Sequence, residues 1–416
     1  MSYFQSEIFK PECANWLGYK PCTEQKKQGL ANCANCAFYQ EGQKILQIVN
    51  KPYSPEELRT ASSVGIVEMG GLGSILRTTA ISKGIRKINP NTPIYWFTHT
   101  RGAELLKYVP NVTPIDVEAG KFDQSALRVD VLVNFESSNN QGRVVEIVKA
   151  NTCIAGFALN AQGKFCGVPP YANYLQQLQI DDAFRKANQL TMQRILLESI
   201  GLEYSGPEYD IRLNPSNYQK AAEIINNAFN GRNYADVIGL NIGTSRKGVL
   251  RRWPPYRFSE LIIEVAQSRP EIGILVLSGP EDSDARDEVI QHLGRDKTME
   301  NLAVLPNNIE IGNFMAIIHN CKVVVTADTF GFHVAQAFKK PTVVLVGPMP
   351  DKELELTNEH SIIIGPKLSC SPCYYSCSQP IKGFCMIDIS TNEVTNKILN
   401  ILQTSKPCNA YPTSFR

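Results

Sequence analysis

The sequence predicts an α/β protein with two domains, each a parallel sheet covered by crossover helices. Short apolar runs alternate with helical patterns through the middle of the chain, and this alternation stops and then restarts once. At about 150 residues per domain, 416 residues suffice for two to three domains. Eight of the twelve cysteines cluster near the two ends, which predicts Cys-rich metal-binding segments in addition.

The first α/β half contains three apolar runs that predict strands, at 64–69, 93–98 and 129–135. A glycine-rich loop, Gly70 to Gly73, follows the first run and precedes a helix whose isoleucines recur at helical spacing. Residues 150–215 are less regular, so we expect an insertion and a connector there, with a helix around 187–201.

The second half contains runs at 236–243, 272–279, 323–328 and 341–347, which are nearly all apolar, as in strands covered on both faces. A last helix is expected from Ser390, because Ser390 and Glu393 form a capping box before an apolar stripe. The expected order is a Cys-rich segment, two α/β domains, a four-cysteine metal finger, and a helix with a tail: 1–45, 46–215, 216–365, 366–389 and 390–416.

Composition excludes some functions. Lys plus Arg number 42 and Asp plus Glu 40, and this balance argues against a protein that coats nucleic acid or membrane surfaces. No run of about 18 uncharged apolar residues predicts a membrane span. The first residues lack the basic and apolar regions of a secretory signal, so a cytoplasmic location is expected.

Three loops at predicted strand ends are candidates for ligand binding. Gly70 to Gly73 could bring backbone N–H groups close to an anion, or could simply be a tight turn. The loop 243–253 offers two hydroxyls and four cations, which suit a diphosphate, although a solvated basic loop has the same composition. Asp328, Thr329 and His333 follow a buried strand and open a helix, which favours a phosphate site.

The cysteine clusters have metal-ligand spacings. The C-terminal set has the spacing C-x2-C-x3-C-x7-C and the N-terminal set C-x8-C-x10-C-x2-C. Four thiolates can surround one Zn²⁺ or Fe ion and leave no site for substrate, so each metal would be structural; free buried thiols are the alternative. The two sets are Cys370, Cys373, Cys377 and Cys385, and Cys13, Cys22, Cys33 and Cys36.

Taken together, the loops resemble glycosyltransferase family 9, the heptosyltransferase family, over about residues 64–402. The motifs that carry the resemblance are the following: Gly70-Gly-Leu-Gly-Ser-Ile-Leu-Arg-Thr-Thr79, Asn241-Ile-Gly-Thr-Ser before Arg252-Trp-Pro254, Leu277-Ser-Gly-Pro-Glu281, Asp328-Thr-x-x-x-His333-Val-Ala335 and Val346-Gly-Pro348. The Cys-rich ends are similar to the metal-bearing bacterial autotransporter heptosyltransferases, which carry a cysteine-bound iron.

The resemblance implies two Rossmann-like domains that face across a cleft, the GT-B architecture. It implies an inverting transfer from a nucleotide sugar, ADP-heptose or similar, bound by the second domain, to a protein or glycan acceptor at the first. No catalytic metal is implied, and the assembly state is left open, a homo-oligomer included. The residues it assigns to the donor are Thr244, Ser245, Arg251 or Arg252, Glu281, Asp328, Thr329, Gly331 and His333.

One residue departs from the family pattern in a way that bears on catalysis. The family carries Asp directly after the glycine of the first loop as its expected base, and this chain has Ser74. A hydroxyl without a partner base cannot take up a proton at neutral pH, so Glu68 and Glu136 are the carboxylates expected to substitute. Phe330 stands where the family has glycine, which would reshape the sugar pocket.

Two other functions are kept as hypotheses. The substitution at Ser74 favours a catalytically inactive relative, which would serve as a sugar-nucleotide-binding or scaffold subunit. The cysteines favour a redox or iron–sulfur protein, although their spacing lacks the tight ferredoxin run.

Overall fold

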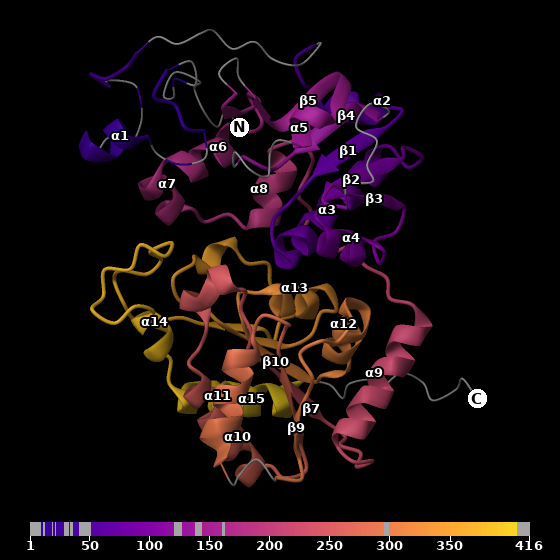
Figure 1. The fold of residues 1–416 in the computed structure, drawn as a ribbon, viewed down its shortest axis with the longest axis vertical. Helices are drawn as coiled ribbons and strands as arrows, with labels where there is room; N and C mark the ends of the chain where they lie inside the picture. Colours follow the sequence, from indigo (N-terminus) through magenta and orange to yellow (C-terminus); the bar gives the residue numbers. More distant parts are fainter. Residues whose placement is uncertain are drawn as a thin grey trace. The chain divides into compact units, whose positions relative to one another are not determined.

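The computed structural model describes residues 10, 13–18, 20, 22–28, 33, 36–40, 51–119, 127–137, 144–159, 163–294 and 299–405. The chain divides into two compact units, Met1–Ile211 and Arg212–Arg416. Each unit contains a six-stranded sheet with helices packed on it (Figure 1). Among the described residues, no helix is long and apolar enough to cross a membrane.

The sheet of the first unit has the strand order β3-β2-β1-β4-β5-β6. All neighbouring strands are parallel except β5 and β6, which are antiparallel. Buried Val and Ile side chains dominate β1, as expected for a strand with both faces covered. The strands are β1 (Val64–Val67), β2 (Ile94–Thr98), β3 (Val112–Asp116), β4 (Arg128–Asn134), β5 (Lys149–Leu159) and β6 (Phe165–Gly167).

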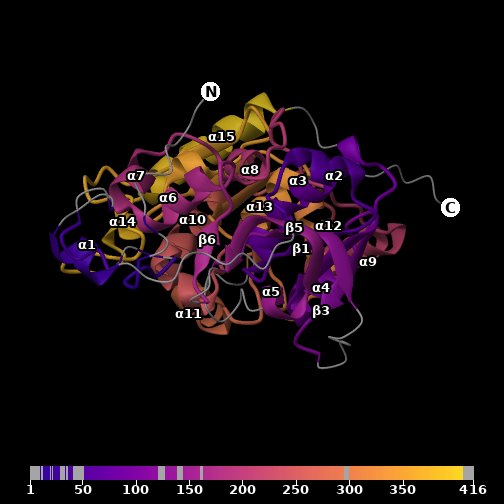
Figure 2. The ribbon, with the colours of Figure 1, turned by 90° about the horizontal axis from the view of Figure 1, so that it is seen from above.

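The longest helix of the first unit, α3 (Leu72–Ile88), begins after Gly71 and packs against α8 (Figure 2). Its buried isoleucines recur at helical spacing, so one face of α3 covers apolar surface. The helices of this unit are α1 (Thr23–Gln28), α2 (Pro55–Thr60), α3, α4 (Thr100–Leu106), α5 (Val144–Ile147), α6 (Asn173–Ile180), α7 (Asp182–Ala187) and α8 (Met192–Glu198).

The sheet of the second unit has the order β12-β11-β10-β7-β8-β9 and is parallel throughout. Relabelled by position along the unit, this is the same order as in the first unit. The strands are β7 (Val237–Asn241), β8 (Gly273–Leu277), β9 (Leu302–Val304), β10 (Val323–Ala327), β11 (Thr342–Leu345) and β12 (Ile362–Ile364).

Helices cover both faces of this second sheet. Helix α10 packs with α11 and α15, and on the other side α12 packs with α9 and α13 (Figure 1). The α-helices are α9 (Pro215–Ala228), α10 (Pro255–Ser268), α11 (Ser283–Leu293), α12 (Ile311–Asn320), α13 (Phe330–Ala337), α14 (Phe384–Ile387) and α15 (Thr391–Thr404), and the 3-10 helices are η1 (Arg246–Arg251) and η3 (Asp351–Glu353).

The predicted α/β class with two parallel-rich sheets is confirmed, and each strand expected from an apolar run is present. The expected irregularity of 150–215 is wrong in part. Strand β5 has eleven residues and pairs with β4 inside the sheet, and α6, α7 and α8 follow it. The exposed first half of β5 carries polar residues, which hid the strand from a search for apolar runs.

Candidate functional site

Both sheets have a topological switch point, where chain order reverses between two neighbouring strands. It lies between β1 and β4 in the first unit and between β7 and β10 in the second. In open α/β sheets, ligands bind beyond the carboxyl ends of the strands at this point. The loops after these four strands contain most of the residues that the sequence singles out.

In the second unit, the start of α13 is held by side chains from two strands. The Asn241 amide, at the end of β7, donates to the hydroxyls of Thr326 at 2.9 Å and Thr329 at 3.0 Å. Thr329 occupies the N-cap position of α13, and its side chain makes no capping hydrogen bond. Because this hydroxyl is tied to Asn241, the first N–H groups of α13 are left to an external acceptor.

A cation and a histidine converge on the preceding aspartate. The Arg251 guanidinium donates to the Asp328 carbonyl at 2.8 Å and lies 3.3 Å from its carboxylate. His333 is buried, and its Nε2 lies 3.9 Å from the other Asp328 oxygen. The structure therefore brings together Arg251, Asp328, Thr329 and His333, four of the residues singled out from the sequence, at the end of β10 and the start of α13.

Asp282 organises the loop after β7, and sequence reasoning missed it. Its carboxylate accepts the backbone N–H groups of Thr244 at 2.9 Å and Gly279 at 3.1 Å, and it pairs with Arg252 at 3.0 Å. Burial raises the pKa of Asp282, while these three donors act in the opposite direction. Arg252 also forms an ion pair with Asp284 of α11. Of the two arginines expected to bind the donor, Arg252 therefore pairs with residues at the start of α11, whereas Arg251 pairs with Asp328.

The remaining predicted donor residues surround this loop. Thr244 is buried, and among the described residues its hydroxyl has no hydrogen-bond partner. Ser245 and Glu281 are exposed, and Glu281 accepts the backbone N–H of Arg246 at 3.2 Å. Phe330 stacks on Phe314 of α12, with ring centroids 5.9 Å apart.

In the first unit, the two predicted substitute bases form a buried pair. Glu68 and Glu136 are 7% and 8% exposed, and their carboxyl groups hydrogen-bond to each other. The Met69 N–H donates to Glu136 at 2.6 Å, and the Gly70 N–H donates to Glu68 at 2.9 Å. Burial, together with the charge of Glu68, raises the pKa of Glu136 to about 8, so the pair shares one proton at neutral pH.

Ser74 lies beside this pair, across Gly70. A Cβ built on Gly70 would lie 2.5 Å from Glu68 Oε1 and 3.3 Å from Ser74 Oγ, so only glycine fits between them. His99 fixes the loop: its Nδ1 accepts the Gly102 N–H at 3.2 Å, so its Nε2 donates to the Gly70 carbonyl at 2.9 Å. Ser74, which stands where the family has Asp, therefore lies close to the Glu68 carboxyl group.

Cys370, Cys373 and Cys377 lie in the loop between β12 and α14, and Cys385 lies in α14. The Gly347 Cα lies against Cys385, whose pKa burial raises to about 11. Backbone N–H groups of Gly383 and Gln379 bond to the Cys377 thiol and lower its pKa. The cysteines form no disulfides. In the described part of the chain, however, no group of three or more His, Cys, Asp or Glu is arranged to hold a metal ion, so the expected metal sites stay predictions.

The fold and its two switch points define the class of the protein as an α/β protein with two parallel-rich sheets. The sequence profile of glycosyltransferase family 9 (heptosyltransferase) matches residues 156–380, more than half of the chain, so the chain belongs to this family. The resemblance inferred from the loop motifs is thereby confirmed.

Curated relatives match a shorter stretch. Lipopolysaccharide heptosyltransferase 2 from Escherichia coli (strain K12) is 28% identical over 119 residues, and the enzyme of the same name from Salmonella typhimurium has the same identity and coverage. Each match covers 28% of this chain and 33% of the relative, so the chain aligns with about a third of each relative's length.

Solved structures share the fold across most of the chain. A family 9 glycosyl transferase from Veillonella parvula has a TM-score of 0.59 at 17% identity, covering 87% of this chain and 100% of that one. The ADP-heptose heptosyltransferase II of Escherichia coli has 0.59 at 16%, covering 82% and 98%. The iron-containing dodecameric glycosyltransferase TibC of enterotoxigenic Escherichia coli has 0.52 at 10%, covering 86% and 78%.

Proposed function

We propose that the protein is an inverting glycosyltransferase that transfers a sugar, heptose in particular, from an ADP-linked donor to a protein or glycan acceptor. Membership of the heptosyltransferase family supports the reaction class. Two structural neighbours are described as an ADP-heptose heptosyltransferase and as TibC in complex with ADP-D-beta-D-heptose, which supports an ADP-heptose donor. The expected cleft between the domains and the cytoplasmic location stay predictions.

The observation that carries the proposal is the uncapped start of α13 beside Arg251. Backbone N–H groups there can bond phosphate oxygens, and the helix dipole favours their negative charge. Arg251 supplies a fork of donors within reach of the same point, and the Thr329 hydroxyl is fixed by Asn241. We assign the diphosphate to Arg251, Thr329 and the N–H groups of α13, with Thr244 and Ser245 from the neighbouring loop and Glu281 at the ribose.

Calorimetric titration with ADP tests this assignment. Arg251→Gln should weaken ADP binding by about tenfold to a hundredfold, because charge-assisted hydrogen bonds to the diphosphate are lost. Arg257→Gln is the matched control, since Arg257 lies on α10 and pairs only with exposed Glu260 among the described residues. Equal ADP affinity in wild type and Arg251→Gln would contradict the site.

For catalysis, we assign proton uptake to the carboxyl pair. As the acceptor oxygen bonds to the anomeric carbon and the bond to the diphosphate breaks, the acceptor hydroxyl loses its proton to Glu68. Before this step the pair carries one negative charge, which the hydrogen bond between Glu68 and Glu136 distributes over both carboxyl groups, and the incoming proton neutralises it. His99 donates to the Gly70 carbonyl, and the Gly70 N–H donates to Glu68. These two hydrogen bonds position the loop beside the carboxyl pair. The leaving diphosphate is stabilised by Arg251 and α13.

Glu68→Gln should lower the transfer rate about 100-fold or more while ADP affinity is unchanged.

The alternative, an inactive donor-binding or scaffold subunit, is favoured by Ser74 alone. It predicts that wild type binds ADP-heptose without turnover and that Ser74→Asp gains activity. Full wild-type activity that both Glu68→Gln and Glu136→Gln retain would reject both the carboxyl pair and the inactive subunit.

We further propose that Cys370, Cys373, Cys377 and Cys385 hold a structural iron or zinc ion. The two N–H donors at Cys377 suit a thiolate. Tyr374 and Tyr375 between the ligands have positive φ angles of 47° and 67°, a conformation that costs energy and that metal ligation would compensate. The description of TibC as iron-containing supports the assignment. Such a closed set of four thiolates supplies folding energy and no catalytic position.

A further inference from the structure

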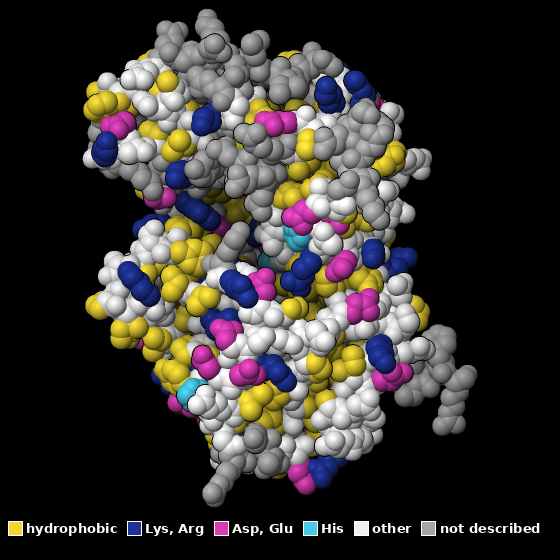
Figure 3. All heavy atoms as spheres, in the orientation of Figure 1, with side chains coloured by type: hydrophobic (Ala, Val, Ile, Leu, Met, Phe, Trp, Pro, Cys, Tyr) yellow, Lys and Arg dark blue, Asp and Glu magenta, His cyan; other side chains and the backbone are white. Residues whose placement is uncertain are grey.

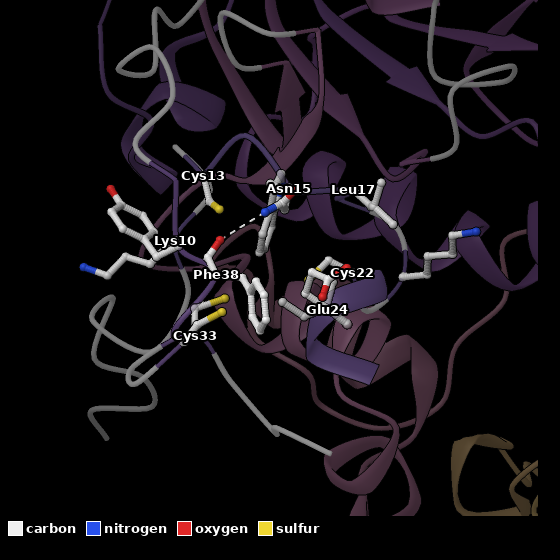
Figure 4. A pocket seen from close by; sticks show the side chains of 13 residues that line it. Lys10, Cys13, Asn15, Leu17, Cys22, Glu24, Cys33 and Phe38 are labelled. Carbon is white, nitrogen blue, oxygen red and sulfur yellow. Dashed lines mark hydrogen bonds between the residues drawn. The ribbon is translucent and has the colours of Figure 1, made fainter. Parts of the chain in front are cut away.

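The N-terminal segment contains a second convergence of cysteines, far in sequence from the C-terminal finger. Cys13, Cys22, Cys33 and Cys36 all line one pocket, and none of them forms a disulfide. Figure 4 shows Cys13 and Cys33 on one side of this pocket and Cys22 next to α1, with Phe38 between them in this view. Four thiols from 24 residues of chain around one hollow are a complete ligand set for a tetrahedral site.

The first part of this segment, residues 13–18, is bound to the sheet and helices of the first unit by several contacts. The Trp16 indole packs with Cys166 and Ile180 and donates to the Phe165 carbonyl at 3.0 Å. Gln176 donates to the Gly18 carbonyl at 2.7 Å. Gly18 has a φ of +82°, and a Cβ there would lie 2.4 Å from the Phe165 oxygen. This close approach requires glycine.

The second part comprises the described residues 22–28, 33 and 36–40, and its last residues contact the preceding chain. The Ala14 N–H donates to the Gln40 carbonyl at 3.0 Å, the Asn15 amide donates to the Phe38 carbonyl at 3.1 Å, and the Lys10 ammonium lies over the Tyr39 ring, 5.8 Å from its centroid. Phe38 and Tyr39 are 47% and 39% exposed, so these two large aromatic side chains of the described residues are partly in solvent. Small segments of this kind usually need a disulfide or a metal to be stable.

The charges around the pocket suit a metal bound by thiolates. Four thiolates and one divalent cation carry a net charge of −2, and two lysines, Lys10 and Lys20, line the same pocket with one carboxylate, Glu24. The Cys33–Cys36 turn is closed by the Cys36 N–H, which lies 3.4 Å from the Cys33 carbonyl. This turn brings two ligands to one side, as paired cysteines do in structural zinc sites.

We propose that Cys13, Cys22, Cys33 and Cys36 bind one thiophilic metal ion, zinc or iron, which fixes residues 22–40 to the first unit. The four thiols surround the pocket, although no group of them among the described residues is in place to ligate. Binding therefore draws the four thiols together and releases their protons to solvent. This site is separate from donor binding and from the C-terminal finger.

Elemental analysis of the full chain for zinc and iron tests the proposal. Cys33→Ser/Cys36→Ser should contain one metal equivalent fewer per chain than wild type, whatever the C-terminal finger holds. Cys373→Ser/Cys377→Ser tests that finger separately, so the two sites can fail independently. Lys27→Ser, exposed on α1, is the control and should leave the metal content unchanged.

Limited proteolysis with chymotrypsin gives a second readout. Cleavage at the exposed Phe38 and Tyr39 should be at least tenfold faster in Cys33→Ser/Cys36→Ser than in wild type, while ADP affinity stays the same. An unchanged metal content in the double variant would overturn the proposal. So would mass spectra of unreduced, alkylated wild type in which these four cysteines are joined as disulfides.

Discussion

Gly331 illustrates how a single residue controls the donor site. A Cβ at this position would lie 2.6 Å from the Asn241 amide nitrogen, which is the group that holds the Thr329 hydroxyl. Gly331→Ala should therefore displace Asn241, weaken ADP binding about tenfold and cost about 1–3 kcal/mol of unfolding free energy. Titration calorimetry and urea denaturation measure both effects.

Gly71→Ala provides the comparison for that variant. Gly71 precedes α3 with a φ of −63°, and nothing lies within 4 Å of a Cβ built there. Alanine should be tolerated at this position with unchanged stability and ADP affinity. If Gly331→Ala behaved in the same way, the Asn241–Thr329 contact would not shape the site.

Glu136 should make stability depend on pH. Its pKa is raised from 4.5 to about 8 by burial and by Glu68, so between these values the folded chain holds a proton that the unfolded chain has lost. Stability therefore falls as pH rises from about 5 to about 8 and levels off above, by up to a few kcal/mol. Glu136→Gln should remove most of this slope.

Chemical denaturation at several pH values between 5 and 9 measures this effect. Asp287→Asn is a suitable control, because Asp287 lies on the exposed side of α11 and is 71% exposed. A wild-type slope that Glu136→Gln leaves unchanged would show that the carboxyl pair is fully ionised in the folded state at neutral pH.

The positions of candidate site residues were predictable from sequence where they lie at strand ends. Glu68 and Glu136 each follow an apolar run, and their neighbourhood follows from β1 and β4 being parallel neighbours. Asp282 was missed because its role depends on a contact with Thr244, 38 residues away in another loop. Nothing in the residues around Asp282 distinguishes it from an ordinary helix-capping residue.

At the scale of elements, apolar runs predicted the central strands, and short or partly polar elements were missed. Strands β3, β9 and β12 have three to five residues each, and each lies in a sheet through its pairing with one neighbouring strand. Helix α12 was also missed, because its mostly apolar sequence has no polar stripe from which to infer a helical period.

Helix α15 begins where the capping box predicted. Ser390 accepts the Glu393 N–H at 3.3 Å, and the helix buries Val394, Ile398 and Ile401 in the core of the second unit. Ser390→Ala should cost about 1 kcal/mol of stability, because an N–H at the helix start loses its partner.

Urea denaturation followed by far-ultraviolet circular dichroism measures that loss. Ser390→Asp is the matched variant, since aspartate also caps helices and should retain wild-type stability or exceed it. Equal destabilisation by alanine and aspartate would mean that the Ser390 hydroxyl does not cap α15.

For the whole molecule, the two units repeat one strand order, and both place their polar loops at the switch point. The charge balance of the sequence has a counterpart on the surface: Figure 3 shows Lys and Arg interspersed with Asp and Glu over the described residues of the visible face. A second α/β unit could be predicted, because the alternation of apolar runs and helical patterns stops and then restarts along the sequence. The order of the strands in each sheet could not be predicted, because it depends on which strands pair with each other.

The two units should differ in their response to nucleotide. All residues assigned to ADP belong to Arg212–Arg416, which has its own sheet and core. ADP at about 100 times its Kd should stabilise that unit by about 2.7 kcal/mol, because it binds the folded state only. In scanning calorimetry, one transition of the full chain should therefore move to higher temperature.

Residues 212–416 alone should bind ADP with the affinity of the full chain, and residues 1–211 should not bind it. A folded 212–416 fragment without affinity for ADP would mean that the donor site requires the first unit.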